Sequence, residues 1–294
     1  MISSKTLYSK YFAEYKLDAN TLQKLQNTLL EILVDVKKVC DKHNIDYMLS
    51  GGTLLGAIRH NGFIPWDDDI DIMMCRTEYE RFVPLFRNTF SDKYMLVEPL
   101  ETEYYVSKAP KIFLKNSEYI EIANAGIPEY GMVFLDLFII ENMAPVGIQR
   151  QIVSKIYDFA YKASSLCVDY KFPSPIIENK AETNYEIRKY YSFRKRFGWL
   201  FTLFGGMTFY LRIIEKIARK YNHTGWLGVP SAISYNREIF EESVFLEVCE
   251  HEFCGYNMKI PKHYDLYLQN LYGDYMKIPP VEKREMHVAY RIHL

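Results

Sequence analysis

Four aspartates within five consecutive positions form the most informative cluster of the chain: Asp67, Asp68, Asp69 and Asp71. If this segment is extended, Asp69 and Asp71 point to the same side, because side chains alternate between the two faces of a strand. Carboxylates this close together repel one another unless a cation lies among them. Oxygen ligands of this kind suit Mg²⁺ or Mn²⁺, so the cluster predicts a metal site for phosphoryl transfer. A solvated turn that caps a strand is the alternative interpretation.

Two features elsewhere in the chain favour the phosphoryl-transfer interpretation. Gly51 and Gly52 precede a predicted helix, and bare backbone N–H groups at the positive end of a helix bind phosphate. Asp136 lies in the middle of the apolar run 132–140. A buried carboxylate is costly unless a metal, a partner or a proton neutralises it. The three features together predict a phosphate subsite beside a set of carboxylates.

The elements that must position these residues follow from the pattern of apolar side chains. Spacings of three and four predict a helix over 21–43, and 45–49 is typical of a strand. Thr53 is a good N-cap for a helix that ends at His60. The other elements expected in this half are strands at 70–74, 94–97, 108–114 and 132–140 and a helix at 78–90.

The second half of the chain divides into two parts. From residue 148 to about 221 the pattern is helical, with breaks at 172–175 and at Gly205-Gly206. The remainder, 224–294, mixes short strands and turns with a helix near 263–271. We therefore predict a catalytic core over 1–147, a helical region over 148–223 and a C-terminal segment over 224–294 that completes the active site.

The window GGTLLGAIRHNGFIPWDDDIDI, residues 51–72, resembles the signature of the LicD family of cholinephosphotransferases, whose eukaryotic relatives include fukutin and the fukutin-related protein. The resemblance continues at 131–140 and at 267–287, YLQNLYGDYMKIPPVEKREMH, but not across the helical middle. It implies an α/β (α+β) fold with a mixed sheet, the nucleotidyltransferase core of the DNA polymerase β type, to which a helical region is added.

The resemblance also implies the roles of individual residues. It makes Asp69 and Asp71 paired metal ligands, Asp67 a further acidic ligand, and Asp136 a third carboxylate that completes the metal site or takes a proton. Arg59 and His60 are expected to contact phosphate, or else to be cations at a helix end, and Trp66 stacks on the base or packs in the core. The positions assigned to the donor and its phosphates are Gly51, Gly52, Thr53, Arg59, His60, Trp66, Arg284 and His287, with Lys283 beside them.

The amino-acid composition narrows the expected binding partners and the expected cellular compartment of the protein. The 36 Lys and Arg balance 37 Asp and Glu, which excludes a generally basic nucleic-acid-binding surface. Five cysteines, an odd number, indicate a reducing compartment, and we expect a cytoplasmic protein. Residues 185–221 carry nine Lys or Arg against two Glu. The segment 188–211 is expected either to lie on an anionic membrane surface or to form a buried helix hairpin with its charges in water.

These observations lead to one expected reaction and its rivals. The resemblance implies Mg²⁺- or Mn²⁺-dependent transfer of phosphocholine from a CDP-linked donor, CDP-choline, to a sugar hydroxyl. The acceptor would be a lipid-linked precursor of a cell-surface glycan, such as lipopolysaccharide, teichoic acid or capsule. Transfer of ribitol phosphate or glycerol phosphate, and true nucleotidyl transfer, are alternatives that keep the same site. A catalytically inactive glycan- or nucleotide-binding module is the alternative from another class.

Overall fold

A mixed seven-stranded sheet forms the centre of the molecule in the computed structural model, which describes residues 10–127, 131–284 and 288–294. The main path runs β1-β2-β6-β4-β3, and β7 and β8 extend it from β6. β2 and β6 are parallel, and the other neighbours are antiparallel. The strands are β1 (Met48–Leu49), β2 (Asp71–Cys75), β3 (Tyr94–Val97), β4 (Lys111–Leu114), β6 (Phe134–Asn142), β7 (Trp226–Gly228) and β8 (Ile239–Glu241). The predicted α/β class with a mixed sheet is confirmed.

Three helices of the N-terminal half accompany this sheet: α2 (Ala19–His43), α3 (Gly51–His60) and α4 (Arg76–Phe90). α2 begins two residues before its predicted start, because the Asp18 carboxylate caps it by accepting hydrogen bonds from the N–H groups of Asn20 and Thr21. The predicted start of α3 is wrong. Ser50 takes the N-cap position, and Thr53 lies inside the helix.

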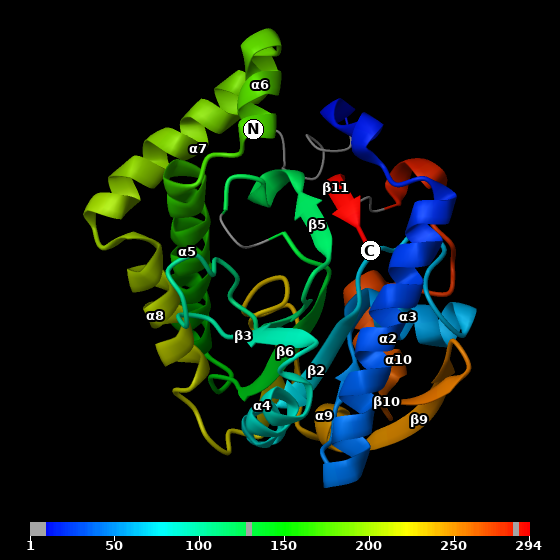
Figure 1. The fold of residues 1–294 in the computed structure, drawn as a ribbon. Coiled ribbons are helices and arrows are strands. Elements are labelled where there is room, and N and C mark those ends of the chain that lie inside the picture. Colours follow the sequence, from blue (N-terminus) through cyan, green and yellow to red (C-terminus); the bar gives the residue numbers. More distant parts are fainter. Residues whose placement is uncertain (1–9, 128–130, 285–287) are drawn as a thin grey trace.

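The middle of the chain is helical, as predicted. Its helices are α5 (Ile148–Lys171), α6 (Pro175–Thr183), α7 (Tyr185–Leu203) and α8 (Gly206–Ala218). In the view of Figure 1 they lie on one side of the sheet, and α2, α3 and α10 lie on the other. Among the described residues, no single helix has the length and apolar composition needed to cross a bilayer. α7 and α8 meet those two criteria only as a pair, and they are bent by 76°.

The C-terminal part returns to the sheet and to the first helices. β7 pairs with the end of β6, and α10 (Tyr264–Tyr272) contacts α3. The remaining elements are the short helices η1 (Ala13–Tyr15), η2 (Ile122–Asn124), η3 (Val281–Lys283) and α9 (Ser243–Leu246), the hairpin β9 (Val248–Phe253) and β10 (Tyr256–Pro261), and the pair β5 (Glu118–Glu121) and β11 (Ala289–His293).

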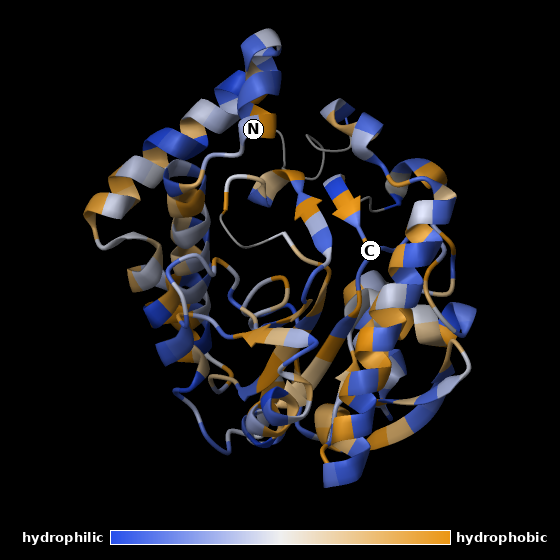
Figure 2. Ribbon diagram, viewed as in Figure 1, coloured by the Kyte–Doolittle hydropathy of each residue, from blue (hydrophilic) through white to orange (hydrophobic). Residues whose placement is uncertain are grey.

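The two largest buried clusters of the described residues hold these layers together. The larger joins α2, the sheet and α10, and includes Ile32, Ile72, Leu137 and Tyr267. Figure 2 shows the apolar residues along β2 and β6 that contribute to it. The second cluster joins α5 and α8 to the C-terminal part through residues such as Tyr157, Leu211 and Tyr235. The helical region therefore has a core of its own beside that of the sheet.

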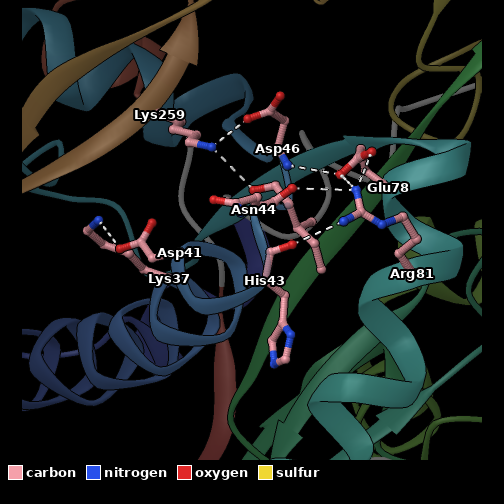
Figure 3. A network of polar contacts seen from close by, with 9 residues as sticks. Lys37, Asp41, His43, Asn44, Asp46, Glu78, Arg81 and Lys259 are labelled. Carbon is pink, nitrogen blue, oxygen red and sulfur yellow. Dashed lines mark hydrogen bonds and ion pairs between the residues drawn. The ribbon is translucent and has the colours of Figure 1, made fainter.

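A polar network fixes the connection between α2 and β1, the strand that leads to the glycine pair (Figure 3). Arg81 Nη2 donates to the His43 carbonyl at 3.0 Å, and Glu78 accepts hydrogen bonds from Arg81 and from the Asp46 N–H. From the other side, Lys259 of β10 pairs with Asp46. Asn44 in this connection adopts a left-handed φ of 50°. The entry into β1 is thus held between α4 and β10.

Candidate active site

Strand register brings two of the predicted carboxylates together. β2 and β6 are neighbouring parallel strands in which Asp71 lies opposite Asp136. β4 runs antiparallel to β6 on its other side and places Lys111 opposite Asp136. Lys111 Nζ lies 2.8 Å from Asp136 Oδ1 and 3.0 Å from Oδ2. The two side chains are only 11% and 16% exposed, so Lys111 is a close partner of a predicted catalytic residue.

The glycine pair lies against two of the other carboxylates. A Cβ on Gly51 would lie 3.1 Å from Asp71 Oδ2, and a Cβ on Gly52 would lie 3.0 Å from Asp67 Oδ2. The hydroxyl of Thr53 accepts a hydrogen bond from the Asp71 N–H at 2.9 Å, and the Ser50 N–H donates to the Asp71 carbonyl at 3.0 Å. The first turn of α3, with its positive dipole end, is therefore fixed to the start of β2.

Gly51→Ala should reduce both stability and activity. Gly51 has a φ of +49°, in the left-handed region, where a Cβ costs roughly 1–2 kcal/mol. The new methyl group would also press on Asp71. We expect urea unfolding to report a loss of about that size, with transfer activity reduced at least tenfold at temperatures where the variant is folded. Gly147→Ala is a control for the backbone cost alone, because Gly147 has a φ of +133° and nothing within 4 Å of its Cβ position. A fully active Gly51→Ala would contradict this role.

The carboxylates affect one another strongly. Burial raises the pKa of Asp71 well above its usual range, and the nearby charges of Asp69, Asp136 and Asp67 raise it further, whereas Lys111 acts in the opposite direction. Asp68 lines the same small cavity as Asp69 and Asp136, but its Oδ2 accepts a hydrogen bond from the Tyr119 hydroxyl at 2.7 Å. Asp67, Asp69, Asp71 and Asp136 thus form the acidic cluster, and Asp68 has a structural partner.

The acidic cluster fits a hard divalent cation by the chemistry of its donors. Its side chains offer only carboxylate oxygens, which suit Mg²⁺ and Mn²⁺, and a cation would relieve the repulsion that raises the pKa of Asp71. Among the described residues, no group of three or more His, Cys, Asp or Glu side chains has an arrangement that could hold a metal ion. Asp136 is held by Lys111 instead.

A cavity of about 370 Å³ opens beside Gly52 and Asp67, and four of the eight predicted donor-binding residues line it. Arg59, Trp66 and Arg284 line it, although Arg284 comes from the opposite end of the chain. The Arg284 guanidinium carbon lies 4.0 Å from the centre of a Trp66 ring. Trp66 also packs against the main core, which agrees with one of its two predicted roles. Its stacking on a base stays a prediction.

His60 lies behind this cavity. Its Nε2 accepts a hydrogen bond from Arg59 Nε at 2.9 Å, and its ring meets Trp66 edge-on at 6.4 Å between centroids. Burial and the charge of Arg59 lower the pKa of His60, which keeps the ring neutral and able to accept that bond. His60 therefore orients Arg59. His287 lies outside the described residues, as does the side chain of Lys283.

A buried chain of hydroxyl groups behind the glycine pair was not predicted from the sequence. The Tyr267 hydroxyl donates to Glu238 Oε2 at 2.6 Å and lies 3.1 Å from Ser50 Oγ. The Gly51 N–H donates to the same hydroxyl at 3.4 Å. Tyr267 belongs to the tail motif YLQNLYGDY, so the family resemblance could have identified it as a functional residue. Glu238 lies in a loop where no sequence pattern marks it.

Glu238 should make the stability of the protein depend on pH. Burial raises its pKa from 4.5 to about 7, opposed by the Tyr267 hydrogen bond and by Lys108. The folded protein therefore binds a proton that the unfolded chain releases, and the free energy of unfolding should fall as pH rises from about 4.5 to about 7. In Glu238→Gln this slope should become shallower without vanishing, because Glu141, whose pKa is also raised to about 7, and Asp71 retain their shares. Urea unfolding at pH 5, 6, 7 and 8 measures it, and an unchanged slope would contradict the assignment.

Comparison with known proteins agrees with this arrangement. The family LicD/FKTN/FKRP, nucleotidyltransferase domain, matches residues 44–153. The lipopolysaccharide cholinephosphotransferase LicD of Haemophilus influenzae is 29% identical over 269 residues, which cover 91% of this chain and 96% of that protein. Shorter matches are an uncharacterized protein of Rickettsia typhi, 38% identical over 63 residues (20% of each chain), and one of Rickettsia prowazekii, 49% identical over 45 residues (15% of this chain, 17% of the other). The signature window, with its acidic cluster, thus lies in a segment similar to the LicD/FKTN/FKRP nucleotidyltransferase domain, and nearly the whole chain is similar to a LicD cholinephosphotransferase.

Proposed function

We propose that this protein transfers phosphocholine from CDP-choline to a sugar hydroxyl of a cell-surface glycan, with lipopolysaccharide as the first candidate. The observation that carries the proposal is the acidic cluster packed against the glycine pair at the start of α3. The near full-length similarity to a lipopolysaccharide cholinephosphotransferase supports the choice of transferred group and acceptor.

The donor diphosphate would lie between the glycine pair and the cavity beside it. The N–H groups at the start of α3 and the guanidinium groups of Arg59 and Arg284 offer hydrogen bonds to its oxygens. A divalent cation held by Asp67, Asp69 and Asp71 would neutralise the charge that develops as cytidine monophosphate leaves. Trp66 and Arg284 line the part of this cavity that we assign to the nucleotide.

The acceptor hydroxyl would approach from the Asp136 side of the cluster. Its oxygen forms a bond to the phosphorus of phosphocholine while the bond from that phosphorus to cytidine monophosphate breaks. Asp136 has two roles open to it, as a further ligand of the cation or as the group that takes the hydroxyl proton. In both, Lys111 fixes the orientation of the carboxylate through its contacts with both oxygens.

A panel of donors tests the proposed reaction. The protein is incubated with Mg²⁺ and with CDP-choline, CDP-ribitol, CDP-glycerol or CDP-ethanolamine, with and without lipopolysaccharide that lacks phosphocholine. We expect release of cytidine monophosphate from CDP-choline alone, dependent on the acceptor and abolished by a chelator. Release from another donor would change the transferred group. Tight nucleotide binding without release from any donor would favour the binding module.

We also propose that the helical region rests on an anionic bilayer, where a lipid-linked acceptor would be held. Exposed apolar side chains gather at the turn between α7 and α8 and on α5: Ile148 (77%), Phe159 (55%), Trp199 (49%), Leu203 (64%), Phe204 (65%) and Phe209 (45%). The turn lies at the outer edge of the molecule (Figure 1). Exposed basic residues on the same helices, Arg188, Lys189, Arg196, Arg212 and Lys216, complement anionic headgroups.

Phe204→Ser should weaken membrane binding by about tenfold, because burying one large apolar side chain in the interface contributes about 1.5 kcal/mol or more. Sedimentation with vesicles of phosphatidylglycerol and phosphatidylcholine measures it, and vesicles of phosphatidylcholine alone should bind less well. Ile233→Ser, at a 64% exposed position outside the helical region, is the matched control. Equal binding of the two variants would contradict this orientation.

A further inference from the structure

A second large cavity lies between the sheet and the helical region, away from the donor cavity. Its volume is about 460 Å³, and its walls include Lys111 from β4, Tyr161 and Asp169 from α5, and Tyr190 and Arg194 from α7. Lys111 also lines a smaller cavity of about 210 Å³ that contains Asp69 and Asp136. The donor cavity reaches the acidic cluster at Asp67. The cluster is therefore approached by one cavity at Asp67 and by another at Lys111.

The charges that line this second cavity are paired. Lys111 binds Asp136, and Arg194 binds Asp169 and donates through Nη2 to the Ser165 hydroxyl at 2.7 Å. The walls therefore carry no large net charge. Their hydroxyl, carboxylate and guanidinium groups can form hydrogen bonds, and tyrosine rings lie beside these groups. A neutral molecule with many hydroxyl groups matches such a surface: its hydroxyls find both donors and acceptors, and its C–H faces pack on aromatic rings.

The same walls do not suit the quaternary ammonium of choline. Such a group needs aromatic faces that are open to a cation. Here the Lys108 ammonium already lies 3.9 Å from the centre of the Tyr161 ring, and the Arg194 guanidinium carbon lies 5.6 Å from that of Tyr190. Lys111 adds a third cation beside the cavity. The Tyr161 and Tyr190 faces that a choline headgroup would need are therefore already occupied by cations.

We propose that this cavity binds the sugar unit of the glycan acceptor and directs its hydroxyl past Lys111 to the acidic cluster. The inference rests on the proposed function and assigns the acceptor subsite within it. It also gives the helical region a role, because α5 and α7 supply most of the walls. Tyr190 and Arg194 are specificity-determining residues for the acceptor, and neither contacts the donor cavity.

Two variants on the cavity walls test the assignment. Tyr190→Ala removes an aromatic wall, and Ser165→Tyr fills the space next to Arg194. We expect each to raise the KM for deacylated, phosphocholine-free lipopolysaccharide oligosaccharide at least tenfold, with the KM for CDP-choline changed less than twofold. Tyr185→Ala is the matched control, a 68% exposed tyrosine on the same helix that does not line the cavity. Circular dichroism and thermal unfolding show that the variants are folded.

Binding measured without turnover separates failure of this inference from failure of the proposed function. Calorimetric titration of the same oligosaccharide into the protein should give a signal that Tyr190→Ala loses and Tyr185→Ala keeps. An inactive wild type that still binds the oligosaccharide in this way would overturn the reaction and support the subsite. Unchanged acceptor KM and binding in both wall variants would overturn the subsite while transfer stands. If the wall variants raised the KM for CDP-choline and left the KM for the acceptor unchanged, the cavity would be assigned to the donor. That result would also overturn the acceptor subsite.

Discussion

Asp71→Asn should lower the turnover number for transfer by roughly 10³-fold or more while the protein remains folded. Asp71 lies at the start of β2, opposite Asp136 and against Gly51, where its charge faces the position proposed for the cation and the donor phosphates. The amide keeps the shape of the side chain but cannot supply a charged oxygen ligand. Asp69→Asn should have an effect of the same order.

The same substitution should leave the metal-free protein at least as stable as the wild type. Burial and the charges of Asp69, Asp136 and Asp67 make ionisation of Asp71 unfavourable in the folded state, so removal of the charge removes a cost. Thermal unfolding in the presence of a chelator measures it. Asp68→Asn is the matched control, since Asp68 bonds to Tyr119 and should keep activity within tenfold of the wild type. Wild-type turnover in Asp71→Asn would contradict the site assignment.

Lys111→Met should destabilise the protein by about 3–5 kcal/mol, the typical cost of removing one partner from a buried ion pair. Lys111 and Asp136 are both largely buried, and the variant leaves the carboxylate with no ammonium beside it. The double variant Lys111→Met/Asp136→Leu should regain most of that stability, because it removes both charges, yet remain inactive. Urea unfolding of the wild type, the single variants and the double variant gives the coupling energy of the pair. A coupling energy near zero would contradict the structural role of Lys111.

Local sequence signals predicted the acidic cluster and its framework well. The segment 51–72 contains the glycine pair, a short helix and the aspartates close together in the sequence. The apolar run around Asp136 is typical of a buried strand. The N-cap of α3 was predicted three residues too late, at Thr53 and not at Ser50. Thr53 is a good N-cap by type, but Gly51 can adopt a positive φ that lets the helix begin at once, and the Thr53 hydroxyl binds Asp71 instead.

The missed residues depend on contacts between distant parts of the chain. Lys111 becomes a partner of Asp136 only through the register of β4 on β6, which no local pattern encodes. Glu238 meets Tyr267 because the β7–β8 loop folds onto α10. The strand pair β5 and β11 joins segments about 170 residues apart, such as Tyr119 and Ile292, and was invisible for the same reason. Periodicity predicts elements, whereas these pairings are set by tertiary packing.

The measurement that tests the central claim most directly follows two labels through one reaction. CDP-choline labelled in the choline methyl groups and, separately, in the cytidine base is incubated with Mg²⁺ and phosphocholine-free lipopolysaccharide. The account predicts that the choline label enters the glycan, that the cytidine label appears as free cytidine monophosphate in equal amount, and that Asp71→Asn gives neither product. Cytidine label in the glycan, or transfer that persists in Asp71→Asn, would contradict it.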